Sequence, residues 1–397
     1  MTDRIKDIGK RILFFALIAL VWMSSGLICF AEAENLPSDS METESETGPE
    51  LPQADYRSKQ WAMDYMDVYE AWDLIEQLKP VGNFKRVTVA VIDTGVDYLH
   101  KDLAKNMDTK NCVMTVNGEI RRYTRDDLLA NHGTAIAGII AGVHNDYGVD
   151  GVAAGYENDL VSIMGIDVFK GCYRRQKSAS PDDCVAGIHY AVEHGAKVIQ
   201  MCLGHFPDSL DATGLKHDDA ALEAAIDEAT AQGCIVVTSA GNNNKTRTWY
   251  PSDFSNTLST INLKKYKNAY SRNCKKDKSN YGKRKDVSAP GASTYTTLMG
   301  GTYKTFGGTS AASPHCAGVV ALMCYIDPTL TIQDVREILS KSCDDLYTPG
   351  KDIYTGYGKV NAYRAVALTA KRAGYTGFPD RLPEDSLNNV KVKVRVK

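Results

Sequence analysis

The chain has 397 residues, 43% of them hydrophobic, which permits one large domain with a sizeable core or two ordinary ones. Its 46 basic and 49 acidic side chains nearly balance, so the charge gives no reason to expect a nucleic-acid partner. We find no internal repeat in the sequence.

The first segment has the pattern of a targeting signal. Basic residues precede an apolar stretch over residues 12–30, and Ala31-Glu32-Ala33 has the small-x-small form of a signal-peptidase site. We therefore expect residues 1–33 to be a signal peptide, cleaved after Ala33, that directs the rest of the chain out of the cytoplasm. The apolar stretch is also just long enough to span a bilayer, so retention as a membrane anchor stays open.

Two further segments are expected to lie outside the folded core. Residues 34–54 are polar and acidic and cannot bury enough apolar surface to fold, which favours a flexible linker. Residues 376–397 end in valines that alternate with lysine and arginine. An edge strand or a contact with an anionic surface would suit this basic tail, but a disordered end is the expectation.

Between these ends, extended apolar runs alternate with helical periods. In chain order we expect strand 87–93, helix 132–142, strand 160–166, helix 182–194, strand 197–202, helix 219–232, strand 234–238 and helices 310–325 and 331–340. This alternation predicts a parallel sheet with helices on both faces. Ligands of such sheets bind beyond the carboxyl ends of the strands, where Asp93, Leu203 and Asn242 fall.

Three motifs in this pattern carry chemistry. VAVIDTGVD ends a predicted buried strand at Asp93, NHGTAIAG begins a predicted helix at His132, and GTSAASPHCAG sets Ser310 at a tight turn into a helix. A helix N-terminus favours negative charge that develops near the hydroxyl. Each residue alone is more often structural than catalytic, but the three together, in this order and setting, predict a nucleophilic triad.

The order Asp, His, Ser is that of subtilisin, and the chain resembles the subtilisin-like serine proteases. The resemblance runs from about Gln60 to Val366 through ordered pieces that include HKDL, GVDGVAAG, VIQMCLG, IVVTSAGN, YPSDFSN and DVSAPG. It implies a three-layer α/β fold with a mainly parallel sheet and helices on both faces, over a peptidase domain of residues 55–375.

The resemblance also implies the site roles. Ser310 would attack the peptide carbonyl, His132 would move the proton, and Asp93 would orient the imidazole. Asn242 would donate to the oxyanion together with the Ser310 backbone N–H. The alternative for Asn242 is a purely structural role, in which its amide caps the loop.

The substrate is expected to bind as an extended strand. The residues implied as substrate-binding are Cys202, Leu203, Gly204, Trp249 and Thr309. Gln200 and Cys202 depart from the asparagine and the serine, respectively, that are usual at these positions. An extra loop over 205–218 either selects substrates or is an ordinary surface insertion, and Lys245 and Arg247 are expected to point to solvent.

Calcium is the only metal that the resemblance implies, and we expect no organic cofactor. The implied ligands are Asp102, Asn145, the carbonyls of Val143, Tyr147 and Val149, and Asp55 near the start of the domain. Oxygen donors in a glycine-containing loop suit calcium, but a solvated turn explains the sequence NDYG equally well.

Ten cysteines are present, one of them within the predicted signal. Cys202, Cys234, Cys316 and Cys324 fall in predicted core elements, where cysteine commonly serves as a small buried hydrophobe. Cys172 and Cys184 flank a polar loop and are the candidate disulfide. The remaining three have no assigned role, and their spacing does not form a zinc pattern.

Two functions from different classes stay open. The first is an exported, monomeric serine endopeptidase, which either digests proteins broadly or processes one precursor peptide. The second is a non-catalytic binding or regulatory protein with a protease fold. The complete triad favours the first. The second stays open because Gln200 and Cys202 are unusual and residues 34–53 leave no room for the folded pro-domain that secreted subtilisins usually carry.

Overall fold

A computed structural model describes residues 54–170, 179–209, 219–266, 269–271 and 279–378. The predicted signal, nearly all of the acidic linker and most of the basic tail lie outside these residues, as does the greater part of the loop over 205–218. The expectations for these segments therefore stay predictions.

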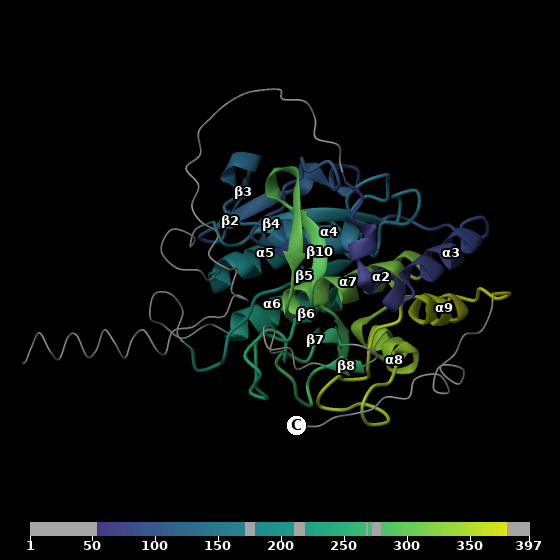
Figure 1. Ribbon diagram of the computed structural model, residues 1–397. Helices are drawn as coiled ribbons and strands as arrows, with labels where there is room; N and C mark the ends of the chain where they lie inside the picture. Colours follow the sequence, from purple (N-terminus) through teal and green to yellow (C-terminus); the bar gives the residue numbers. More distant parts are fainter. Residues whose placement is uncertain (1–53, 171–178, 210–218, 267–268, 272–278, 379–397) are drawn as a thin grey trace, which may run out of the picture.

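A single large sheet organises the described chain (Figure 1). Its strands run in the order β3-β2-β4-β1-β5-β6-β7-β8, and β9 pairs with β7 as well. The bounds are β1 Val87–Asp93, β2 Val113–Val116, β3 Glu119–Arg122, β4 Val161–Asp167, β5 Val198–Met201, β6 Ile235–Ser239, β7 Thr257–Tyr266, β8 Ala269–Ser271 and β9 Val287–Pro290. The central pairs β4-β1, β1-β5, β5-β6 and β6-β7 are parallel. The predicted mainly parallel sheet is thus confirmed.

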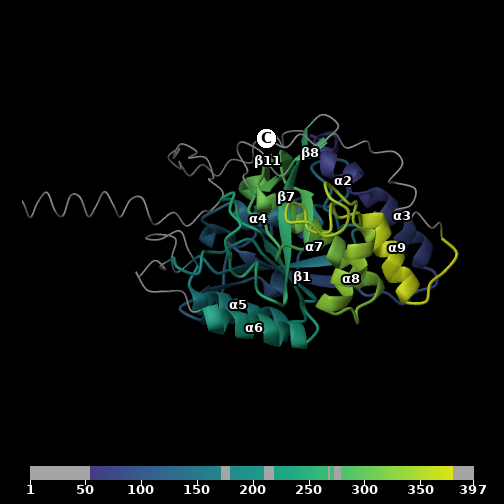
Figure 2. The same ribbon diagram turned by 90° about the horizontal axis from the view of Figure 1, so that it is seen from below.

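Helices cover both faces of the sheet (Figure 2). One face packs against α5 Pro181–Glu193 and α6 Asp219–Ala231, and the other against α3 Val68–Leu78, α4 His132–Ala141, α7 Thr309–Ile326, α8 Ile332–Ser342 and α9 Ala362–Arg372. The short α2 Trp61–Tyr65 precedes α3. The three-layer α/β architecture expected from the sequence is therefore present.

β1 shows how one strand serves two cores. Successive side chains of a strand point to opposite faces, so a strand between two helix layers must be apolar throughout. Val89 and Val91 enter the core beneath α4 and α7, whereas Ala90 and Ile92 enter the core beneath α5 and α6. Burial on both faces explains why this strand reads as a continuous apolar run rather than as an alternating one.

The nine elements expected from the sequence are all present, with ends that differ by one or two residues. The sequence patterns did not predict α2, α3 and α9, the strands β2, β3, β7, β8 and β9, or the separate hairpin of β10 Thr294–Leu298 with β11 Thr302–Phe306. β11 is mostly exposed, and three of its five residues are threonine or lysine, so it lacks the apolar run that marked the central strands.

α7 is the central helix of the molecule, and each of its residues is buried. It is the one helix of the described residues that is long and apolar enough to cross a membrane. Complete burial inside the protein identifies it as a core helix of this fold.

Candidate active site

Asp93 lies at the carboxyl end of β1, where its side chain is 1% exposed. The backbone N–H of Thr94 donates to its Oδ1 at 2.8 Å, which holds the carboxylate at the strand end. Asp167 lies beside it on β4, in register with Asp93. Burial, together with the charge of Asp93, raises the pKa of Asp167 to about 6.

His132 is the first residue of α4, and its Nδ1 lies 2.8 Å from Asp93 Oδ1. The next residue must be glycine, because a Cβ on Gly133 would lie 2.1 Å from the carbonyl oxygen of Gly95. The Gly133 N–H donates to Thr94 Oγ1 at 3.0 Å, which ties the start of α4 to the end of β1. The ring of Phe306 contacts the imidazole edge to face, at 5.3 Å between centroids.

Ser310 lies in the first turn of α7 and is 4% exposed. The chain enters the helix through Gly308, whose φ of 85° favours glycine. The unsatisfied N–H groups and the dipole of this helix end favour negative charge beside the serine.

Asn242 follows β6 and lies against the start of α7. Its Oδ1 accepts hydrogen bonds from the backbone N–H and from Oγ1 of Thr309, each at 3.0 Å. Because one oxygen takes both bonds, the amide orientation is fixed and the Nδ2 end is left for another acceptor. The structure thus brings the predicted residues Asn242 and Thr309 together beside Ser310.

A polar contact behind Ser310 accounts for two unusual residues, Gln200 in β5 and Cys202 directly after that strand. Gln200 Nε2 donates to Ser313 Oγ at 2.8 Å and lies 3.0 Å from Cys202 Sγ. Cys202 Sγ lies 3.7 Å from the carbonyl oxygen of Ser310. Gln200 and Cys202 therefore support the helix that carries the serine, and burial raises the pKa of the Cys202 thiol well above its usual value.

The other predicted substrate residues lie beyond the ends of β5 and β6. Gly204 is followed by His205, which exchanges two backbone hydrogen bonds with Tyr250 at 2.9 and 3.0 Å. This exchange brings Trp249 against Gly204, and the indole is 3% exposed. Arg247 was expected to point to solvent. It does remain half exposed, but it pairs with Asp208 and covers the ring of Phe206.

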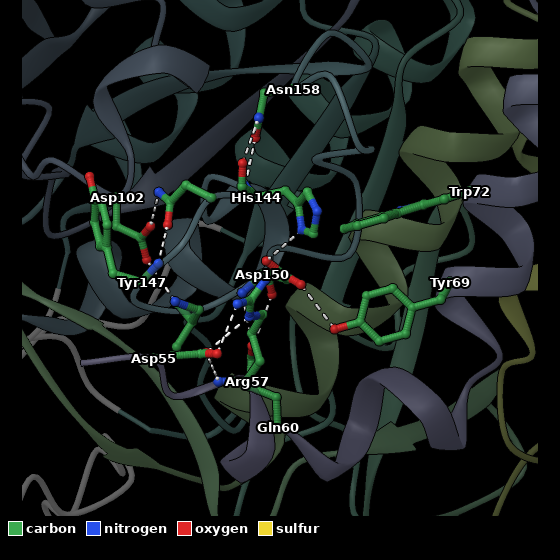
Figure 3. A network of polar contacts seen from close by, with 12 residues as sticks. Asp55, Arg57, Gln60, Tyr69, Trp72, Asp102, His144, Tyr147, Asp150 and Asn158 are labelled. Carbon is green, nitrogen blue, oxygen red and sulfur yellow. Dashed lines mark hydrogen bonds and ion pairs between the residues drawn. The ribbon is translucent and has the colours of Figure 1, made fainter. Parts of the chain in front are cut away.

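The loop predicted to bind calcium closes around Asp102, which is fully buried (Figure 3). Asn145 Nδ2 donates to one carboxylate oxygen at 3.0 Å, and the Val149 N–H donates to the other at 2.8 Å. The hydroxyl of Tyr303 is a further neutral partner, and burial raises the pKa of Asp102 to about 7. Among the described residues, no group of three or more His, Cys, Asp or Glu side chains is placed to hold a metal ion.

The chemistry of Asp102 fits calcium, and that of Asp55 does not. Asn145 would fit with its amide turned, because its Nδ2 faces Asp102 and its oxygen accepts from the Tyr147 N–H at 2.8 Å. A buried carboxylate with only neutral partners is the kind of group that a metal ion stabilises, and amide and carbonyl oxygens lie in the same loop. Both carboxylate oxygens of Asp55 instead accept hydrogen bonds from the Arg57 guanidinium, at 2.8 and 2.9 Å. The charge of Asp55 is therefore already compensated by a cation. The expectation for Asp55 receives no support from these contacts.

Next to this loop lies a buried network that the sequence analysis missed. The Asp150 carboxylate accepts from Tyr69 Oη at 2.9 Å and lies 3.1 Å from His144 Nδ1, and its backbone N–H and carbonyl bond to the side-chain amide of Gln60, each at 2.8 Å (Figure 3). These residues fix the loop against α3, and Trp72 contacts the imidazole of His144 edge to face. No sequence motif signals the network, because its members are far apart in the chain.

The cysteines behave largely as expected. Cys202, Cys234, Cys316 and Cys324 are buried, which confirms their assignment to the core. Cys112 and Cys343, which had no assigned role, are buried too. Cys172 lies outside the described residues, so a bond between Cys172 and Cys184 stays a prediction.

Comparison with known proteins agrees with this geometry. A model of the subtilase family matches residues 85–358. Subtilisin DY of Bacillus licheniformis is 34% identical over 283 residues, covering 70% of this chain and 90% of its own. A thermophilic serine proteinase of Bacillus sp. strain AK1 is 33% identical, with 70% of this chain and 61% of its own covered. Thermitase of Thermoactinomyces vulgaris is 30% identical over 319 residues, with 78% and 97% covered. The chain belongs to the subtilase family of serine endopeptidases.

Proposed function

We propose that this protein is an exported endopeptidase that cleaves extended polypeptides with Asp93, His132 and Ser310. The observation that carries the proposal is the 2.8 Å contact between His132 Nδ1 and the buried carboxylate of Asp93. A histidine held in this way presents its other ring nitrogen as a base, as the triad mechanism requires.

The steps follow from these positions. His132 takes the proton of Ser310 Oγ as the oxygen attacks the carbonyl carbon, and it later gives that proton to the leaving amine. Asp93 stabilises the imidazolium that forms between these two transfers. Water then hydrolyses the acyl-enzyme by the same route in reverse, so one base serves both halves of the reaction.

Asn242 and the backbone N–H of Ser310 would stabilise the tetrahedral oxyanion. Thr309 holds Asn242 by its oxygen, so the amide is set before substrate arrives and needs no reorganisation during the reaction. The N-terminus of α7 adds a favourable dipole at the same place.

The substrate would add backbone hydrogen bonds to the segment Cys202-Leu203-Gly204, which continues from β5 without helical structure. Such contacts are independent of side chains and suit a polypeptide of varied sequence. We propose that the protein acts as a monomer, because one chain supplies every group named above.

Calcium is proposed for the loop around Asp102. Asp102, the Asn145 amide oxygen and the carbonyls of Val143, Tyr147 and Val149 would hold the ion, which would compensate the buried carboxylate. Its role there would be to stabilise the loop, because none of these residues belongs to the triad.

Export, and the segments outside the peptidase domain, are proposed from the sequence. The basic and apolar start with its small-x-small site supports a signal peptide over 1–33, with a membrane anchor as the alternative. Residues 34–54 would be a linker, 55–375 the peptidase domain, and 376–397 the basic tail.

A fluorophosphonate probe, which phosphonylates activated serines with loss of fluoride, tests the proposed function. Labelling that is lost in Ser310→Ala and retained in Ser340→Ala, a serine on the exposed side of α8, supports an active triad. Folded protein that does not label would favour the alternative, a protease fold that only binds. A peptide-library profile of the labelled protein would then separate broad digestion from the processing of one precursor.

A further inference from the structure

Two glycines beyond the sheet contact the same tryptophan. A Cβ on Gly204 would lie 2.3 Å from Nε1 and 2.8 Å from Cε2 of Trp249. A Cβ on Gly241 would lie 2.8 Å from Cε2 and 3.0 Å from Cδ2 of the same ring. The indole therefore occupies the space that the absent side chains of both glycines leave.

This space adjoins the reacting groups. Gly241 directly precedes Asn242, which is bonded to Thr309 beside the serine. The segment that leads to Gly204 also lies close to Ser310, since Cys202 Sγ lies 3.7 Å from the Ser310 carbonyl oxygen. A substrate residue whose carbonyl carbon reaches Ser310 Oγ must then direct its side chain between the two segments, where the indole lies.

The indole is held in place from several directions. The backbone N–H of Trp249 donates to Asp253 at 2.8 Å, and Asp253 in turn forms a buried ion pair with Lys285 at 2.8 Å. Phe206 packs against the indole edge to face, at 4.9 Å between centroids. With the ring 3% exposed, a large guest side chain would have to displace it from a packed site.

We propose that Trp249 closes the primary specificity pocket and restricts the acyl residue, whose carbonyl the serine attacks, to glycine, alanine or serine. The inference rests on the proposed function, because it assigns substrate selection to the same site. Trp249 Nε1 has no hydrogen-bond partner among the described residues, so a serine hydroxyl would find a donor there. Phenylalanine and leucine are excluded by volume.

Peptide substrates that differ only in the acyl residue test this proposal. For the wild-type protein we expect kcat/KM to favour alanine over phenylalanine by about 10²-fold, the scale at which a hydrophobic pocket discriminates by size. Trp249→Ala should reverse the preference, and Trp249→Phe should give an intermediate ratio. Trp61→Ala is the matched control, because Trp61 bonds to Ala292 and should leave the ratio unchanged.

The outcomes separate this proposal from the proposed function. A wild-type protein that labels with fluorophosphonate and cleaves after phenylalanine as well as after alanine overturns the closed pocket and leaves the peptidase intact. An unchanged ratio in a folded Trp249→Ala variant does the same. Absence of both labelling and cleavage would defeat the proposed function itself. If Trp249→Ala does not fold, the wild-type ratio and Trp249→Phe still decide.

Discussion

Thr309 donates both its backbone N–H and its hydroxyl to the single side-chain oxygen of Asn242. The two bonds prevent the amide from turning over, because a rotated amide would present N–H groups to two donors. The Nδ2 end is therefore committed to an acceptor that arrives with the substrate.

The proposed oxyanion role predicts a loss in turnover rather than in affinity. Asn242→Ala should lower kcat by about 10²–10³ with KM nearly unchanged, a magnitude measured for an oxyanion-hole asparagine of a subtilisin. Thr309→Val, which keeps the N–H and removes the hydroxyl, should lower kcat by less. Asn256→Ala is the control, since this half-buried amide pairs with Asp227. A raised KM with unchanged kcat in Asn242→Ala would reject the assignment.

The triad should behave as one unit. His132→Ala and Ser310→Ala should each abolish measurable turnover, and the double variant should be no worse than either alone. Far-UV circular dichroism and the unfolding midpoint check that both variants stay folded. Additive losses in the double variant would show that the two residues act separately.

The free energy of unfolding should depend on pH through the protonation of His315. Burial lowers the pKa of His315 to about 4, from 6.5 for an ordinary histidine. The unfolded chain therefore takes the proton first, and the free energy of unfolding should fall by up to ~3 kcal/mol as the pH decreases from about 6.5 to about 4.

This dependence can be measured by denaturant titration across that pH range. His315→Asn, which retains a donor for the Ala311 carbonyl, should flatten the curve in this window. His194→Gln is the control, because His194 is exposed. An equally steep curve in His315→Asn would assign the acid sensitivity to other groups.

Calcium binding predicts a chelator effect on stability. If Asp102 holds the ion, EGTA should lower the unfolding temperature of the wild type, because a ligand bound only to the folded state stabilises it. Asp102→Asn should lose this response, whereas Asp146→Asn, an exposed carboxylate in the same loop, should keep it. A wild-type melting curve that EGTA leaves unchanged counts against the site.

The ion pair of Lys285 with Asp253 should be far more sensitive than a surface pair. Both side chains are nearly inaccessible, at 1% and 4% exposure. Lys285→Met leaves a buried carboxylate without its cation and should cost about 3–5 kcal/mol in the free energy of unfolding. Lys341→Met removes an exposed pair with Glu337 and should cost under about 1 kcal/mol. Equal effects of the two variants would contradict this difference.

Local sequence predicted the elements that carry the triad because their signals are local. β1 is an apolar run that ends in Asp93, α4 begins at His132, and Ser310 is the second residue of α7, with small residues around it. Each role depends on a strand end or a helix start, which a few neighbouring residues determine.

Contacts between distant segments were beyond the reach of the sequence. Trp249 was expected near the pocket, but that its ring fills the space beside Gly204 depends on the backbone pairing of His205 with Tyr250. The sequence offered Asp55 as a calcium ligand, and only the folded geometry pairs it with Arg57. Charge pairing in three dimensions is not encoded in residue spacing along the chain.

The complete burial of α7 couples the reaction centre to the whole molecule. Backbone amides in a helix without a solvent-facing side exchange their hydrogens only when the surrounding layers separate, so they report the global free energy of unfolding. Ser310 stands at the start of this helix. The rate constant of heat inactivation should therefore equal that of unfolding. We expect no earlier stage in which the active site is disordered while the rest of the fold is intact.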